Sequence, residues 1–141
     1  MNTKPLELSN VTKWHSAGYT GKGVTIAVID SGGKPRSYMQ SYLTDIFNDQ
    51  KESGHGSNVS YVINLFAPDA KIVFLDKAKE SRNYEWLSKN KNHVSLINFS
   101  QTGIGGMPTP QYEKYKGLSI PMICGSGNDY FENTVSAPAR Y

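Results

Sequence analysis

The sequence lacks the marks of a disulfide-bonded or membrane-spanning protein. Its single cysteine, Cys124, cannot form an internal disulfide. Residues 1–5 contain no apolar core of signal-peptide length, and no later stretch is long and apolar enough to span a bilayer. We therefore expect a cytoplasmic protein with no membrane partner. A leader or pro-segment removed before Met1 would leave no trace in this sequence.

The sequence also has no strong excess of positive or negative charge. Fifteen basic side chains stand against twelve acidic ones, a formal net charge of +3. The lysines are scattered among polar residues, as at Lys77, Lys79, Lys89 and Lys91. This pattern is typical of solvated helix faces, so we expect no nucleic-acid partner. The composition is ordinary for a globular protein, and the 141 residues show no repeat or linker. We expect one domain over residues 1–141.

Several motifs for cofactors and nucleophiles are missing as well. The glycine loop at residues 18–23 precedes a predicted strand, whereas phosphate-binding loops follow one. The histidines and acids are too dispersed for a zinc motif. Cys124 ends an apolar strand, which favours an inert buried thiol, and neither Ser126 nor Ser136 lies in a nucleophile-elbow pattern. We expect no metal and no cofactor.

Apolar runs alternate with helical patterns along the chain. Residues 24–29 are almost continuously β-branched and apolar, as expected of a strand buried on both faces. Similar runs predict strands at residues 71–75, 96–97 and 120–124, with a weaker one at 43–47, and helical spacing predicts helices at 55–65, at 81–89 and from Pro110. The alternation predicts the α/β class: a doubly wound, mostly parallel sheet of about five strands with helices on both faces.

Polar residues follow three of the predicted strands. Asp30 ends the strand at residues 24–29, Ser100 follows the strand at 96–97, and Asn128 follows the last strand. Active groups of doubly wound sheets gather at the carboxyl ends of the strands. We therefore expect these three residues to border one cleft.

Asp30 and His55 have the setting of a catalytic acid–base pair. A carboxylate at the end of a buried strand can accept a hydrogen bond from an imidazole and fix its tautomer. His55 lies between two glycines at a predicted helix start, where the helix dipole disfavours the imidazolium and suits a general base. Taken singly, Asp30 is equally typical of a turn before glycines, and His55 of a helix end. His15 and His93 lack such a setting, and we expect them to be structural or exposed.

Asn128 has two interpretations. It follows Gly125-Ser126-Gly127 on a predicted loop, where its amide could donate to a developing oxyanion. Asn128-Asp129 is equally good chemistry for a turn.

Five short motifs occur in a definite order along the chain. They are residues 18–32, 55–59 with 67–70, 97–100, 124–128 and 134–139. In this order they resemble the segments of the subtilisin-like serine proteases, from about Val11 to Tyr141. The resemblance implies that Asp30 is the triad acid, His55 the general base and Asn128 the oxyanion donor. It further implies that the substrate lies between two segments, Ser100, Gln101 and Thr102 on one side and Gly125, Ser126 and Gly127 on the other.

The sequence departs from the family pattern at several points. The nucleophile, which the family carries in a Gly-Thr-Ser-Met-Ala type of segment, has no counterpart in these 141 residues. Asn58 replaces a second histidine, and Thr102 stands where glycine is common. The calcium-binding insertion after the histidine helix is absent, so we expect no structural calcium. By the same resemblance, we expect a cis peptide before Pro138.

The resemblance therefore implies a truncated subtilisin-like domain that acts on protein or peptide substrates but is inactive as this chain alone. The serine would come from a C-terminal segment in the same or another chain. The strand ending at Cys124 would lie at the sheet edge, where that segment or a second copy would cover it. The main alternative is a non-catalytic binding or decoy module that keeps the fold. A fragment without a selected role is a third.

Overall fold

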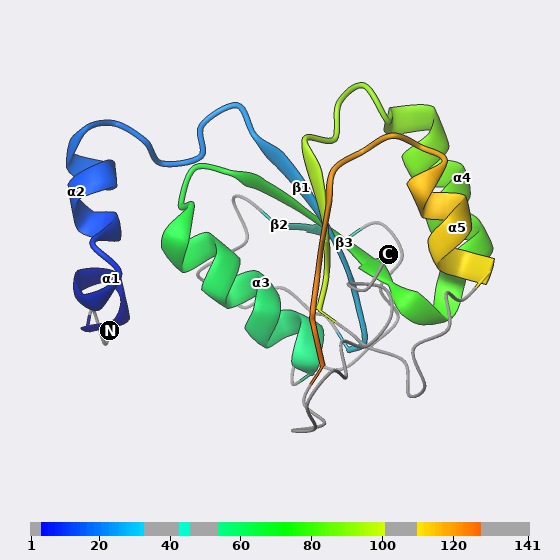
Figure 1. The fold of residues 1–141 in the computed structure, drawn as a ribbon, viewed down its shortest axis with the longest axis horizontal. Helices are drawn as coiled ribbons and strands as arrows, with labels where there is room; N and C mark the ends of the chain where they lie inside the picture. The colour runs from blue at the N-terminus through cyan, green and yellow to red at the C-terminus, as the bar shows by residue number, and fades with distance from the viewer. Residues whose placement is uncertain (1–3, 33–42, 46–53, 101–109, 128–141) are drawn as a thin grey trace.

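The computed structural model describes residues 4–32, 43–45, 54–100 and 110–127, and its centre is a five-stranded parallel sheet (Figure 1). The strand order is β2-β3-β1-β4-β5. The strands are β1 (Thr25–Asp30), β2 (Leu43–Asp45), β3 (Lys71–Asp76), β4 (Leu96–Phe99) and β5 (Met122–Cys124). The helices are α1 (Lys4–Leu8), α2 (Val11–Ser16), α3 (His55–Phe66), α4 (Glu80–Asn90) and α5 (Pro110–Lys116), with a 3₁₀ turn at Lys77–Lys79. The α/β class and the parallel sheet predicted from the sequence are confirmed.

Strand β1 is the centre of the sheet because it pairs with a neighbour on each side. All six of its residues pair with β3, and Ile26, Ala27 and Val28 also pair with β4. Every residue from Ile26 to Asp30 is buried. The unbroken apolar run that predicted this strand therefore reflects burial on both faces, which parallel sheets require.

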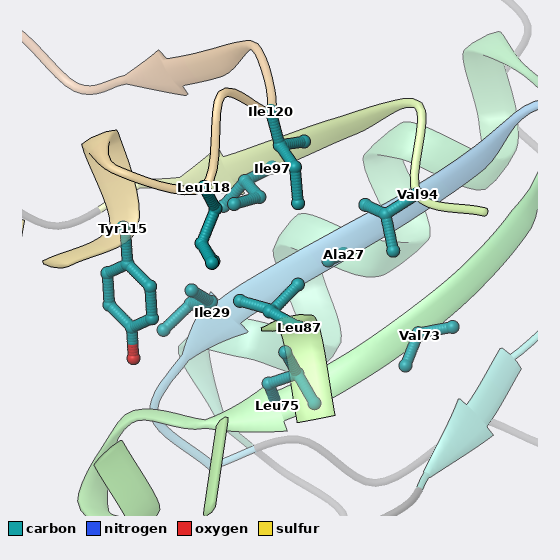
Figure 2. Close-up of a cluster of buried hydrophobic side chains, with 10 residues drawn as sticks. All are labelled: Ala27, Ile29, Val73, Leu75, Leu87, Val94, Ile97, Tyr115, Leu118 and Ile120. Atoms are coloured by element: carbon teal, nitrogen blue, oxygen red, sulfur yellow. The ribbon is translucent and has the colours of Figure 1, made fainter. Parts of the chain in front are cut away.

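Two hydrophobic clusters lie on opposite faces of the sheet. On one face, α4 and α5 cover a cluster that includes Ala27 and Ile29 of β1 and Leu87 of α4 (Figure 2). On the other face, α3 packs against a cluster that includes Val28 and Phe74. Figure 1 shows α3 on one side of the strands and α4 with α5 on the other. Helices thus lie on both faces, as the sequence predicted.

Glycines let the start of α3 approach the end of β1 very closely. The N–H of Gly56 donates to the carbonyl of Ser31 at 2.8 Å, and the N–H of Ser57 donates to the carbonyl of Gly32 at 3.3 Å. A Cβ atom on Gly56 would collide with the Phe74 ring, whose Cζ would be 2.8 Å away, and would touch Asp30 Cβ at 3.0 Å. Any side chain larger than hydrogen at position 56 would therefore clash with the strands beneath it.

Substituting Gly56→Ala should destabilise the fold. The added methyl must displace the Phe74 ring or the helix start, and overpacking of this kind costs about 1–3 kcal/mol. The measurement is urea unfolding followed by circular dichroism. Gly117→Ala is the matched control, because Gly117 is exposed and a Cβ there would be 3.3 Å from its nearest atom, Lys114 O. Equal losses for the two variants would contradict the packing argument.

Candidate functional site

The structure brings Asp30 and His55 together at the carboxyl edge of the sheet. Asp30 is the last residue of β1 and is fully buried, with 0% of its surface exposed. His55 is the first residue of α3, and 56% of its side chain is exposed. The Nδ1 atom of His55 lies 2.8 Å from Oδ1 and 2.9 Å from Oδ2 of Asp30. These distances are those of a charge-assisted hydrogen bond.

The backbone around Asp30 fixes the direction of this bond. The N–H of Ser31 donates to Asp30 Oδ1 at 2.6 Å, which holds the carboxylate against the end of its own strand. The start of α3 is tied to Ser31 and Gly32 by its first N–H groups, so the imidazole and the carboxylate belong to one rigid junction. A buried carboxylate accepts hydrogen bonds only, and Nδ1 of His55 must therefore be the donor.

This arrangement fixes the role of the other ring nitrogen of His55. With the proton held on Nδ1, the Nε2 atom of the neutral ring is an acceptor, and no residue in the described part of the chain hydrogen-bonds to it. The ring is more than half exposed, so a hydroxyl group from outside could reach Nε2. Chemically, the pair can take a proton at Nε2 while the buried carboxylate stabilises the resulting imidazolium.

Strands β4 and β5 present a second group of predicted site residues at the same edge. Ser100 follows β4, and its hydroxyl donates to Asn98 Oδ1 at 2.9 Å. Gly125 follows β5, and its N–H donates to the carbonyl of Phe99 at 3.2 Å. Gly127 adopts φ = 111°, a conformation that favours glycine. Ser100 therefore adjoins the segment that begins at Gly125, and the cleft expected between them stays a prediction.

Other predicted site residues lie outside the described part of the chain. Gln101, Thr102 and Asn128 are among them, and so is Pro138 with the cis peptide expected before it. Their positions and roles stay predictions. Asn98 was the residue that sequence reasoning missed: it lies in an otherwise apolar strand and orients the Ser100 hydroxyl. A polar residue within an apolar strand was the feature of the sequence that could have identified Asn98.

The remaining titratable candidates have structural surroundings. Burial raises the pKa of the Cys124 thiol, which favours the protonated, unreactive form, although the side chain is only half-buried. His15 Nε2 lies 2.9 Å from the carbonyl of Phe66, at the end of α3, and His93 is exposed.

Within residues 4–32, 43–45, 54–100 and 110–127, no three histidine, cysteine or acidic side chains form a metal-binding group. No helix in those same ranges has the length and apolarity to cross a membrane.

Comparison with known proteins finds proteases among the similar proteins. No family model matches the chain. Among curated proteins, it is 25% identical to the minor extracellular protease Epr of Bacillus subtilis (strain 168) over 99% of its own length. Among solved structures, it is similar to the prenylagaramide maturation protease PagA, with 19% identity and a TM-score of 0.67 over 92% of the chain. It is also similar to MycP1 with its propeptide removed, with 18% identity and a TM-score of 0.55 over 89% of the chain.

The relatives are longer proteins. The chain spans 25% of Epr, 54% of PagA and 49% of MycP1. About half of each solved structure therefore has no counterpart in this chain.

The Asp30–His55 bond predicts an unusual tautomer for His55. A hydrogen bond to a charged group is worth about 1.5–3 kcal/mol, so the Nδ1–H form should dominate roughly tenfold or more. The ¹⁵N chemical shifts of the ring in the neutral state report this directly. Asp30→Ala should move the proton population toward Nε2, whereas the exposed ring of His93 should be unaffected. A population at His55 that does not respond to Asp30→Ala would contradict the assigned bond.

The sequence motifs, the sheet topology and the similar proteins all support the same family resemblance. The motif order predicted from the sequence is matched by the parallel sheet and by protease relatives in both comparisons. The resemblance is thereby confirmed: this chain is similar in sequence to one subtilisin-like protease, Epr, and in fold to two others, PagA and MycP1.

Proposed function

We propose that this chain is the acid–base portion of a subtilisin-like serine endopeptidase, and that its 141 residues do not cleave peptides without a serine supplied by another segment. The hydrogen bond between buried Asp30 and exposed His55 is the observation that carries this proposal. It supplies the orientation and the proton acceptor that such a reaction needs. The sequence contains no nucleophile segment of the family type.

The proposed reaction assigns one step to each residue. The serine oxygen bonds to the scissile carbonyl carbon as its proton passes to Nε2 of His55, and Asp30 stabilises the imidazolium. The amide of Asn128 donates to the oxyanion that forms. The carbon–nitrogen bond then breaks, and His55 returns the proton to the leaving amine. Water hydrolyses the acyl-enzyme in a second cycle of the same transfers.

The substrate of the proposed enzyme is an extended peptide. It would lie between the segment of Ser100, Gln101 and Thr102 and the segment of Gly125, Ser126 and Gly127. Ser100 and Gly125 follow neighbouring strands whose carboxyl ends meet at this edge, which supports such a binding mode. Neither metal nor cofactor takes part in the proposed reaction. The cytoplasmic location stays a prediction, and Epr is described as extracellular.

The alternative is a binding or decoy module that uses the fold without catalysis. Among the described strands β5 lies at the edge of the sheet, and the 59% exposure of its Ile123 favours a protein partner in either case. The two functions differ in what they require of the acid–base pair. A binding module keeps its partner after Asp30→Ala or His55→Ala, whereas a protease loses turnover.

The first expected outcome concerns the chain alone. Purified protein should show no peptide turnover and no labelling by a fluorophosphonate, because the sequence contains no nucleophile segment of the family type. Intact mass spectrometry after incubation with the reagent measures this, with an active serine protease as the positive control. A serine labelled one-to-one would reveal a nucleophile within these residues and overturn the assignment.

The second expected outcome concerns complementation. Adding a serine-bearing segment that restores cleavage should yield an activity that depends on His55. His55→Ala should lower kcat by about 10⁶-fold, the loss found in subtilisin itself when the base is removed. His93→Ala is the matched control and should leave kcat unchanged, because His93 is exposed and distant in sequence from the pair. Restored cleavage that survives His55→Ala would reject His55 as the base.

A further inference from the structure

The last residue of β3 lies beside the last residue of β1. Asp76 is the register partner of Asp30, and neighbouring strands lie about 4.8 Å apart. Val28 and Phe74, two residues earlier in these strands, belong to the cluster on the α3 face. Because side chains alternate along a strand, Asp30 and Asp76 both point to that face, where His55 begins α3. The position of Asp76 therefore limits where the Asp30 carboxylate can lie.

Asp76 is held through both its side chain and its main chain. Its Oδ1 atom accepts from the N–H of Ala78 at 2.9 Å, which caps the 3₁₀ turn. Its carbonyl oxygen accepts from Nδ2 of Asn83 at 2.7 Å, in a bond that is buried. Asn83 belongs to α4, which packs on the opposite face of the sheet from α3 (Figure 1). The bond from Asn83 therefore connects that helix layer to the strand end beside Asp30.

Asn83 occupies a position that helical spacing assigns to the core. It lies four residues before Leu87 on α4, and both residues have 0% of their surface exposed. Leu87 is part of the hydrophobic cluster on this face (Figure 2). The Oδ1 atom of Asn83 is buried and has no hydrogen-bond partner in the described part of the chain. Such an atom costs about 1–3 kcal/mol, so the amide points to a role for the bond that its nitrogen makes.

The side chain of Asn83 also lies beside Tyr115 of α5. Tyr115 is buried in the same cluster (Figure 2). Burial and the negative charge of Glu80 raise the pKa of Tyr115 to about 12, and a side-chain hydrogen bond with Asn83 opposes that rise. The amide is thus packed between the strand end and α5, which limits the rotamers open to it. A supporting residue must be restricted in this way to hold a site in one geometry.

We propose that Asn83 is a positioning residue for the Asp30–His55 pair and acts through the end of β3. By holding the Asp76 carbonyl, Asn83 fixes the strand end that pairs with Asp30, and the carboxylate then keeps the direction that Nδ1 of His55 requires. The inference rests on the proposed function for the roles of acid and base. The simpler explanation is that the bond only ties α4 to β3, in which case its loss lowers stability and leaves the pair unchanged.

The tautomer of His55 separates these two explanations without using activity. Asn83→Leu keeps the approximate size of the side chain and removes the donor. The ratio of Nδ1–H to Nε2–H, measured by the ring ¹⁵N chemical shifts, should fall several-fold toward the ratio in Asp30→Ala. Asn90→Leu is the matched control, because Asn90 ends the same helix and its Nδ2 donates to the carbonyl of Trp86 at 2.8 Å. The control should leave the ratio unchanged.

Two results would overturn the positioning role. One is an unchanged His55 tautomer ratio in an Asn83→Leu variant that unfolds cooperatively. The other is an equal fall in the ratio for Asn83→Leu and Asn90→Leu, because general loosening of α4 would then be the cause.

The reverse measurement keeps the inference testable if Asn83→Leu does not fold. Coupling between two sites is reciprocal, so a change at His55 must be felt at Asn83. His55→Ala removes a side chain that is 56% exposed, and it should shift the side-chain amide resonance of Asn83. The amide resonance of Asn90 is the internal control and should stay in place. An Asn83 resonance that does not respond would reject the connection.

The positioning role and the proposed function fail independently. In the complemented protein, Asn83→Leu should lower kcat several-fold and leave KM unchanged, because the acid–base pair is disturbed and the substrate contacts are not. A lower tautomer ratio without any peptide cleavage would keep the positioning role and reject the proposed function. Cleavage with a kcat that Asn83→Leu does not change would do the reverse.

Discussion

The junction between the end of β1 and the start of α3 is the constraint on which the rest of the site depends. A fully buried carboxylate is costly unless hydrogen bonds compensate it, and Asp30 receives them from the Ser31 N–H and from His55. The imidazole can reach the carboxylate only because Gly56 lets α3 lie against Phe74 and Asp30. Packing in the sheet therefore sets the position of the base, and the base satisfies the buried acid.

The architecture was largely predictable because its signals are local. Buried central strands appear as unbroken apolar runs, and the helix expected at residues 55–65 is observed at His55–Phe66. The boundaries were less predictable where tertiary contacts decide them. The strand expected at residues 96–97 extends to Phe99 because it pairs with both β1 and β5. The strand expected from residue 120 begins at Met122, because Ile120 packs into the core beside Leu118 and Pro121 has no N–H to donate.

The site was predictable in part for a different reason. Asp30 and His55 lie 25 positions apart, and only their motif order and the parallel topology predicted that they would meet. The bond between Ser100 and Asn98 depends on side-chain rotamers after β4, about which the sequence pattern carries no information. The exposure of Ile123 was also beyond local reasoning, since apolar character alone predicts burial. Whether such a residue is buried depends on elements distant in the chain.

The energetics of the junction distinguish the two candidate functions. A buried ionic pair is seldom needed for stability, and apolar replacements of similar volume are often neutral or stabilising. A module that only binds a partner gains nothing from the Asp30 carboxylate or from an exposed Nε2 on His55. A general base requires both, since the carboxylate must orient the ring and the outer nitrogen must be accessible. The arrangement therefore favours the proposed role of His55 as a general base over that of a binding module.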